Sequence, residues 1–578
     1  MATETTSKPK QTSPRRWVFA VLLIYVLFVG AFLRTRGLNW GEYQYLHPDE
    51  RFLIWVGTDI SPVESFSAYW DTANSSLNPH NQGHNFYVYG TLPMFLARYV
   101  VEWIYGHSGF QEMTNVGRAL SASADILTIL LVYLIGKHVY GRRVGILAAA
   151  FSALAVLQIQ LSHYFTMDTF TTFLSALSVY FAVRVAMNPK IEAVRKNEIL
   201  TSGHEENIDP VGEELSPGQD EEGEQIIVTT TKSRNLSAEI VRVITDPMFL
   251  LCLGFGIALG MATASKINAA PLAFLLPGAL LIRLYTLPES ERSQWTFDGL
   301  IYLVFAGVVS AIVFRIFQPY AFQGPGFFGI IPNNAWFDNL RELQNLTGGD
   351  ADFPPAMQWA RRPVWFSWQN LVLWGLGIPL SLLSWTGFLW VAWRIVKGDW
   401  QRHILLWLWT AFYFTWQSLV GNPSMRYQLL IYPLLAIYAA WSLVSLYDIG
   451  SKKIDKTRSR QWPRIVAILI GGLALISTFG YALGFSSIYA RPITRLEASR
   501  WIFQNIPGPL NLHIQSEGEI YNQPLPYPDN YVVEPNFPFV SSFSPKESGV
   551  LSDVFFANVV ALGESEGEIL LKITISEH

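Results

Sequence analysis

The sequence predicts an all-α protein that crosses a membrane many times. Half of its 578 residues are hydrophobic and only 15% are charged. Its mean hydropathy of +0.24 is higher than a soluble domain of this length needs. Apolar runs recur along the chain, and each is about 20 residues long, the length that crosses a bilayer as a helix. These observations together predict a polytopic membrane protein.

Counting the apolar runs gives about eleven transmembrane helices. They are expected at residues 17–33, 119–135, 144–161, 169–187, 248–264, 269–285, 300–317, 371–396, 403–420, 429–446 and 465–485. Basic residues, among them Arg15 and Arg16, precede the first run, and two connections, 136–143 and 451–460, are strongly basic. Because Lys and Arg collect in cytoplasmic loops, we expect a multi-pass protein of the cell membrane with its N-terminus in the cytoplasm and its C-terminus outside.

Three long connections do not fit simple spans. Residues 34–116 form a first outer loop, in which the amphipathic stretch 91–105 is expected to lie along the membrane interface. Residues 188–245 are rich in acidic residues, Gly and Ser, which predicts a disordered acidic cytoplasmic loop. Residues 318–370 are punctuated by prolines and form a second outer loop, suited to act as a lid.

The chain becomes more polar after residue 485. A helix is expected at 495–505, and strand-like runs occur at 554–561 and 568–575. This pattern predicts a small extracytoplasmic α/β or β-rich tail. The expected division is a cytoplasmic N-terminal tail at 1–16, a transmembrane catalytic domain at 17–485 and an extracytoplasmic C-terminal region at 486–578.

Several classes of function are not favoured by the composition. The single cysteine, Cys252, lies in an apolar run, so no disulfide framework or thiolate metal site is expected within one chain. The net charge of −4 does not suggest a nucleic-acid partner. No Gly-rich phosphate loop appears, so a soluble nucleotide donor is not favoured either.

The first outer loop contains the sequence His47-Pro48-Asp49-Glu50-Arg51, shortly after the first span. Carboxylates near lipid are costly and tend to mark functional sites. A plainer interpretation is a helix start, with Pro in the first turn and acids at the positive end of the helix dipole. The two interpretations are compatible, and Asp49 and Glu50 are the candidate catalytic residues.

Further charged residues are predicted on the same outer face. Asp168 precedes the fourth span, Lys266 lies in a tight turn before the sixth, and Arg426 precedes the tenth. Additional cations are available from Arg98, Arg118 and Arg362. A carboxylate can accept the proton of an incoming hydroxyl, while a cation stabilises charge that develops on a phosphate leaving group. The pattern therefore suits a reaction on an anionic lipid phosphate, although each residue alone is also explained as an interfacial charge.

The chain resembles the GT-C membrane glycosyltransferases over roughly residues 17–510, and within them the phospholipid-carrier-dependent group of protein O-mannosyltransferases and the aminoarabinose transferase of lipid A. The matching pieces occur in the expected order at 47–51, 117–122, 163–168, 264–268, 318–322 and 426–433. The resemblance implies a GT-C fold with interfacial helices in the first outer loop.

The resemblance also implies a function. A sugar, a mannose-like hexose or a relative of one, would pass with inversion from a polyprenyl-phosphate carrier to a hydroxyl of a protein, lipid or glycan acceptor. Asp49 would act as the base and Glu50 as its partner. Residues expected to bind the carrier phosphate or substrate are Lys266, Arg118, Arg426, Asp168, Arg98 and His47. Arg98 would replace the cation of a Lys-Pro-Pro-type motif, which this chain lacks at 89–93.

Alternatives remain at this stage. A transporter or flippase for a lipid-linked or small substrate also needs many spans, but its ionisable residues usually lie near the bilayer midplane. A non-catalytic receptor or scaffold would not require acids and cations on one face. A divalent metal held by His80, His84, His47 and His163 is not favoured, because the first loop has no Asp-x-Asp sequence.

Overall fold

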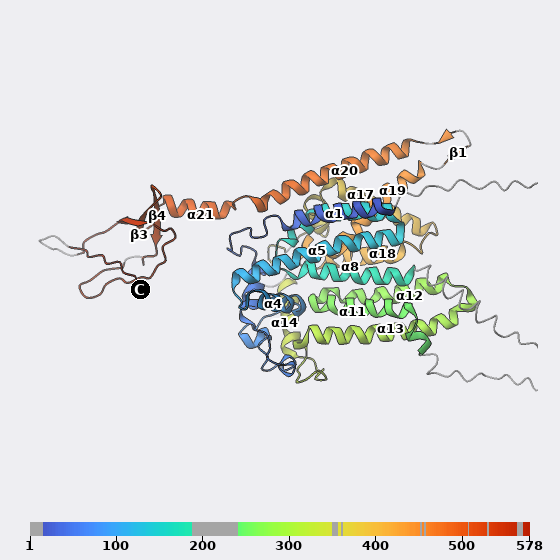
Figure 1. The fold of residues 1–578 in the computed structure, drawn as a ribbon, viewed down its shortest axis with the longest axis horizontal. Helices are drawn as coiled ribbons and strands as arrows, with labels where there is room; N and C mark the ends of the chain where they lie inside the picture. The colour runs from blue at the N-terminus through green and yellow to red at the C-terminus, as the bar shows by residue number, and fades with distance from the viewer. Residues whose placement is uncertain are drawn as a thin grey trace, which may run out of the picture. The chain divides into compact units, whose positions relative to one another are not determined.

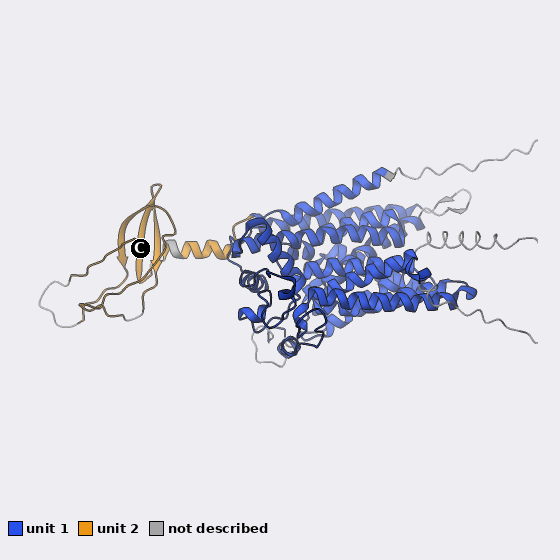
Figure 2. Ribbon diagram, turned by 60° about the horizontal axis from the view of Figure 1, so that its bottom comes forward, with its two compact units in different colours: residues 1–490 blue, residues 491–578 orange. Residues whose placement is uncertain are grey.

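The computed structural model describes residues 16–187, 241–348, 357–359, 362–450, 453–455, 458–459, 461–506, 508–528, 531–562 and 570–577. The predicted acidic loop at 188–245 therefore lies almost entirely outside the described residues, as does the N-terminal tail. The chain forms two compact units, Met1–Ala490 and Arg491–His578, which are coloured separately in Figure 2.

Unit 1 is a bundle of long helices that run side by side (Figure 1). Among the described residues, eight helical segments are long and apolar enough to cross a membrane. They are α1 (Arg16–Thr35), α5 (Phe110–Tyr140), α8 (Met167–Ala186), α11 (Pro247–Ser265), η2 with α12 (Ile267–Phe274 and Leu275–Thr286), α13 (Glu289–Phe317), η5 with α19 (Met425–Ile431 and Tyr432–Ile449), and the segment that begins with α20 (Trp462–Ser486) and η6 (Ser487–Ala490).

A ninth span is formed if a bent pair is counted as one. Helices α6 (Arg142–Leu154) and α7 (Val156–Ser162) meet at Ala155 with a bend of 58°. The predicted count of eleven is not confirmed. Helices α17 (Ile378–Val396) and α18 (Ile404–Leu419) occupy the two remaining predicted positions, but α18 has only 16 residues and α17 carries three tryptophans that lower its hydropathy.

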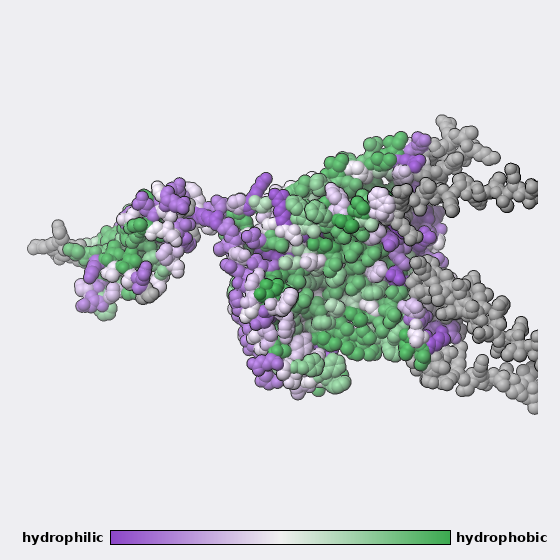
Figure 3. Space-filling model, viewed as in Figure 1, coloured by the Kyte–Doolittle hydropathy of each residue, from purple (hydrophilic) through white to green (hydrophobic). Residues whose placement is uncertain are grey.

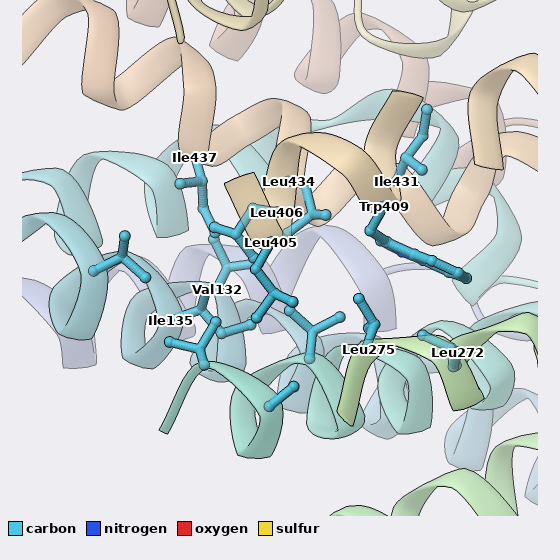
Figure 4. Packing of buried hydrophobic residues seen from close by; sticks show 14 of the residues in the cluster. Val132, Ile135, Leu272, Leu275, Leu405, Leu406, Trp409, Ile431, Leu434 and Ile437 are labelled. Carbon is cyan, nitrogen blue, oxygen red and sulfur yellow. The ribbon is translucent and has the colours of Figure 1, made fainter. Parts of the chain in front are cut away.

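The helices of unit 1 surround one large apolar core. Figure 4 shows side chains from distant parts of the sequence meeting there, such as Val132 of α5, Leu275 of α12 and Leu434 of α19. Glycines allow the closest approach: a Cβ on Gly256 of α11 would lie 2.4 Å from the carbonyl oxygen of Ala306 of α13. Close packing at small residues is typical of helices within membranes.

The outer surface of the bundle is also apolar. Side chains of α20 such as Ile468, Leu473 and Ile476 are more than half exposed. Figure 3 shows a broad hydrophobic band along the helices, with hydrophilic residues gathered at the end that carries the long loops. An exposed band of this kind faces lipid. The protein is therefore a multi-pass membrane protein.

Short helices cover the end of the bundle that carries the two outer loops. The first outer loop contains α2 (Pro48–Asp59), α3 (Phe66–Tyr69), η1 (Pro79–Gln82) and α4 (Thr91–Tyr105). The predicted amphipathic helix at 91–105 is present with those bounds; Met94 and Val101 are buried, while Trp103 is exposed. The second outer loop adds η3 (Pro319–Ala321), α14 (Asn334–Thr347), α16 (Phe366–Asn370) and the π-helix η4 (Leu371–Gly375).

A short hairpin, β1 (Lys453–Asp455) with β2 (Arg458–Ser459), joins α19 to α20. Unit 2 contains α21 (Thr494–Asn505) and an antiparallel sheet in the order β4-β3-β5, formed by β3 (Leu510–Ser516), β4 (Glu519–Leu525) and β5 (Val550–Phe556). The small sheet agrees with the predicted β-rich tail. The expected strand at 568–575 is not formed over the described residues 570–577, which are irregular.

Candidate active site

The start of α2 fixes the position of Asp49. Pro48 opens the helix, and the imidazole Nδ1 of His47 accepts a hydrogen bond from the backbone N–H of Glu50 at 3.3 Å. This is an N-cap, with two acids in the first turn where the helix dipole favours negative charge. The helix-start interpretation of this motif is therefore correct, and it fixes the direction in which each acid points.

Four charged side chains from four separate segments meet in a row. Arg426 donates to Asp49 at 2.5 Å through Nη1, and its Nε lies 3.7 Å from Asp168. Lys266 donates to the other oxygen of Asp168 at 2.7 Å. The order Asp49, Arg426, Asp168, Lys266 alternates in charge, and its formal sum is zero. We call these four residues the charge row.

Each member of the charge row sits at the end of a helical element. Asp168 lies in the first turn of α8, and Lys266 is the C-cap of α11. Arg426 lies in η5, whose N-cap Ser424 accepts from the Arg426 N–H at 3.4 Å. The ring of Tyr427 lies beneath both cations, 4.9 Å from Lys266 Nζ and 5.6 Å from the Arg426 guanidinium carbon. Cation–π contacts of this kind hold a cation in place without neutralising it.

A cavity of about 510 Å³ lies against one end of the row. Asp49 and Arg426 both line it, and their side chains are about a quarter exposed. Its other walls come from the α7 segment, the end of α14 and the residues before η5. The polar and aromatic side chains that line it include His47, Gln160, Tyr164, Gln358, Trp359 and Asn422. A cavity with a carboxylate, amides and aromatic rings suits a sugar or another hydroxyl-bearing ligand.

Burial lowers the pKa of His47 below its usual value, and the nearby Arg426 lowers it further, while Asp49 raises it. Its ring also lies against Tyr164, with centroids 4.5 Å apart. A neutral imidazole is needed for Nδ1 to accept the Glu50 N–H, so the lowered pKa and the capping role agree.

Glu50 points away from Asp49 although the two are adjacent in sequence. Its side chain is fully buried, and both oxygens accept from Arg118, at 2.7 and 2.8 Å. One oxygen also accepts the backbone N–H of Phe165 at 2.9 Å. Arg118 donates in addition to the carbonyls of Leu38 and Trp40. This pair joins α2, α5 and the turn before α8 in the protein interior.

Two other predicted cations also lie apart from the charge row. Arg98 is buried and donates to the Ile60 carbonyl at 2.8 Å and to Glu102 at 2.7 Å, which holds the end of α2 against α4. Arg362 lies over the ring of Phe366. The structure thus brings together Asp49, Asp168, Lys266 and Arg426, with His47 beside them, and it separates Glu50, Arg118, Arg98 and Arg362 from them.

The candidate metal-binding histidines are not gathered. His80 contacts the amide of Asn339, His84 contacts Asp59, and His163 contacts the carbonyls of Ile159 and Arg36. In the part of the chain that the structure describes, no group of three or more His, Cys, Asp or Glu side chains is placed to hold a metal ion.

Sequence reasoning missed Tyr427, Gln160 and Tyr164. Tyr427 follows Arg426 directly, and an aromatic beside a cation near the membrane was a usable signal. Gln160 was hidden because residues 144–161 appeared to be one straight span, and Tyr164 follows that span directly. The bend at Ala155 turns α7 toward the cavity, and a buried network of Arg34, Asp125 and Gln158 holds that bend.

The fold has counterparts among known structures. The archaeal oligosaccharyltransferase AglB from Archaeoglobus fulgidus, solved with an inhibitory peptide and a dolichol-phosphate, matches with a TM-score of 0.51 at 15% identity, over 85% of this chain and 58% of that chain. This chain has the GT-C fold of membrane glycosyltransferases. It spans less than two thirds of the AglB chain.

Weaker matches to other GT-C proteins accompany this one. ArnT from Cupriavidus metallidurans matches with a TM-score of 0.42 at 14% identity, over 82% of this chain and 76% of that chain. The S. cerevisiae protein O-mannosyltransferase Pmt1-Pmt2 complex matches with a TM-score of 0.33 at 18% identity, over 54% of this chain and 36% of that chain. No curated protein matches the sequence significantly.

A family model described as dolichyl-phosphate-mannose-protein mannosyltransferase matches residues 100–194. Arg118 and Asp168 fall within this segment, and Asp49, Lys266 and Arg426 lie outside it. The predicted resemblance to the GT-C class is confirmed at the level of the fold.

Proposed function

We propose that this protein is a membrane glycosyltransferase that moves a hexose, such as mannose, from a polyprenyl-phosphate carrier to an acceptor hydroxyl, with inversion at the anomeric carbon. The supporting observation is the charge row, which lies beside a cavity at one end of a GT-C bundle. In the proposed orientation the N-terminus is cytoplasmic and the charge row and unit 2 are extracytoplasmic.

The electrostatics of the row suit an anionic donor. Without substrate, two carboxylates balance two cations. A polyprenyl-phosphate sugar is a phosphodiester with one negative charge, and loss of the sugar leaves a phosphate monoester with a second ionisable oxygen. Lys266 and Arg426 are cations that stabilise this added charge in the transition state.

Asp49 is the proposed base. The acceptor oxygen attacks the anomeric carbon as the bond between that carbon and the phosphate oxygen breaks, and the hydroxyl proton passes to the Asp49 carboxylate. The electron pair of the broken bond stays on the carrier phosphate. Asp49 and Lys266 stand at opposite ends of the row, so attack from one end and departure at the other give inversion.

Arg426 links the base to the donor. In the ligand-free protein its guanidinium binds Asp49. A bound phosphate competes for that guanidinium, which frees the Asp49 carboxylate to accept a proton. The base would then become available only when the donor is in place.

Glu50 takes a positioning role in this proposal instead of acting as a second acid. Both of its oxygens are already engaged by Arg118 and Phe165 inside the protein. Arg118 and Arg98 act in the same way, since they bind Glu50 at the start of α2 and the Ile60 carbonyl at its end, and thereby orient Asp49. His47 caps the helix from inside the cavity wall.

The test is a product analysis with the purified protein in lipid vesicles. Polyprenyl-phosphate hexoses are mixed with peptide, lipid and glycan acceptors, and products are identified by mass spectrometry. We expect a glycosylated acceptor and free polyprenyl phosphate, with no product from Asp49→Asn. The matched control is Asp59→Asn at the end of the same helix, where the carboxylate contacts His84 and lies away from the row; it should retain activity.

Two outcomes would contradict the proposal. Transfer by Asp49→Asn at the rate of the unmodified protein would remove Asp49 from the chemistry. Movement of the intact donor across the bilayer, without cleavage of any donor in the panel, would support a transporter instead.

A further inference from the structure

A second hollow lies at the opposite end of the bundle from the charge row. It has a volume of about 350 Å³ and is formed by α6, α19 and α20. Arg143 at the start of α6 and Tyr447 near the end of α19 line it. The other ends of these elements lead to α7 and η5, which line the candidate active site, so this hollow belongs to the other membrane leaflet. We call it the inner groove.

The walls of the inner groove are aliphatic and its floor is glycine. Leu147, Leu443 and Ile468 stand on three different helices around it. Gly471 and Gly472 of α20 supply no side chain there. A Cβ added to Gly472 would meet nothing within 4 Å, and one on Gly471 would meet Leu443 at 3.4 Å. The two adjacent glycines leave a channel that is open to lipid. The other faces of the same helix carry exposed leucines and isoleucines.

The rim of the inner groove is cationic. Arg143 donates to Asp448 at 3.0 and 3.3 Å, but more than half of its side chain remains exposed. Arg464 donates to the Tyr447 hydroxyl at 2.9 Å, and its guanidinium lies 4.8 Å from the Tyr447 ring. The rim therefore carries two guanidiniums, one paired with the Asp448 carboxylate and the other bound to the Tyr447 hydroxyl. Each guanidinium has five N–H donors, more than these contacts use.

We propose that the inner groove binds an anionic glycerophospholipid of the leaflet opposite the charge row, with its phosphate on Arg143 and Arg464 and one acyl chain along Gly471 and Gly472. A phosphate matches the guanidinium fork. Basic pockets between transmembrane helices on one side of a membrane are suited to anionic headgroups. In a bilayer lipid the acyl chain begins at the depth of the phosphate. In the inner groove the channel likewise begins at the cationic rim.

The test uses a phosphatidylglycerol with a photoreactive diazirine in one acyl chain. The full-length protein is placed in phosphatidylcholine vesicles that contain this probe, and cross-linked peptides are mapped by mass spectrometry. Cross-links are expected in the segments 443–447 and 467–472. Gly472→Leu places a branched side chain at the channel, where a Cβ meets nothing within 4 Å, so it should lower cross-linking about tenfold.

The matched control is Gly480→Leu on the same helix. A Cβ on Gly480 also meets nothing within 4 Å, but this residue does not line the inner groove. Cross-linking should persist in this variant. Replacing either rim arginine, as in Arg143→Gln or Arg464→Gln, should weaken capture of the anionic probe about fivefold and leave capture of a phosphatidylcholine probe unchanged.

Three results would overturn the proposal. Equal capture of the phosphatidylcholine and phosphatidylglycerol probes would remove the role of charge. Undiminished cross-linking in Gly472→Leu would place the acyl chain elsewhere. Displacement of the probe by unlabelled polyprenyl phosphate, but not by unlabelled phosphatidylglycerol, would identify a carrier lipid as the occupant instead.

Discussion

Breaking the buried pair of Glu50 and Arg118 should lower the free energy of unfolding by a large amount that can be calculated. Both side chains are almost completely excluded from solvent, and Arg118 supplies two of the three hydrogen bonds that Glu50 accepts. The change Arg118→Met keeps a long side chain but leaves the Glu50 carboxylate with the Phe165 N–H alone. Breaking a buried pair in this way costs about 3–5 kcal/mol, because an uncompensated charge stays in the interior.

The assay is the midpoint of unfolding in a denaturing-detergent titration, followed by a transfer measurement on the folded fraction. The control Arg341→Met removes an exposed pair with Asp338 and should cost at most about 1 kcal/mol. The double variant Glu50→Leu with Arg118→Met should recover part of the loss, because no buried charge is then left unpaired. An Arg118→Met protein that is no less stable than the control would show that the buried pair does not hold this part of the fold.

Three further predictions concern the site. Lys266→Ala should raise KM for the lipid donor more than KM for the acceptor, and equal effects on both would argue against a phosphate contact. The pKa of His47 is lowered in the folded protein, so its neutral, capping form contributes stability that is fully present above the unfolded pKa of about 6.5 and is lost as the pH falls through the lowered folded pKa. His47→Asn, which caps without titrating, should remove this acid loss of stability, and its persistence would assign the loss to another group. A cysteine at Ser424 should react with an impermeant maleimide from outside intact cells and one at Lys397 only after permeabilisation; the reverse pattern would invert the proposed topology.

Hydropathy and charge were enough to predict most of the elements that carry the site. The bilayer requires long apolar helices, so most spans and the amphipathic helix α4 follow directly from residue patterns. The positions of the basic loops predict the side of the membrane on which each connection lies. This was enough to group Asp49, Asp168, Lys266 and Arg426 on one face. The structure brings these four into hydrogen-bonded or ionic contact.

The direction of each side chain was not available from the sequence. Successive residues on a helix point about 100° apart, so Asp49 can face a cavity while Glu50 faces the interior. The partner of Glu50, Arg118, is 68 residues away on α5. No proline or glycine occurs at the bend near Ala155, so nothing local predicted that α7 would form a wall of the cavity.

The predicted count of eleven spans is not confirmed. Helices α17 and α18 lie where spans were predicted, but α18 has only 16 residues and neither helix is among the segments long and apolar enough to cross a membrane. Contacts within the bundle hold both helices in place, because Leu380 and Val391 of α17 and Leu406 of α18 are buried in the common core. A helix stabilised by neighbouring helices does not need a continuous apolar surface toward lipid.

A single-turnover experiment with donor already bound to Asp49→Asn isolates the role of the Asp49 carboxylate in the chemical step. If Asp49 is the base, transfer slows by about a hundredfold to ten-thousandfold, the range for loss of a general base. Donor binding should be unchanged or tighter, because Arg426 is released from its pair with Asp49. Transfer at an unchanged rate, or loss of donor binding together with transfer, would contradict the role proposed for Asp49.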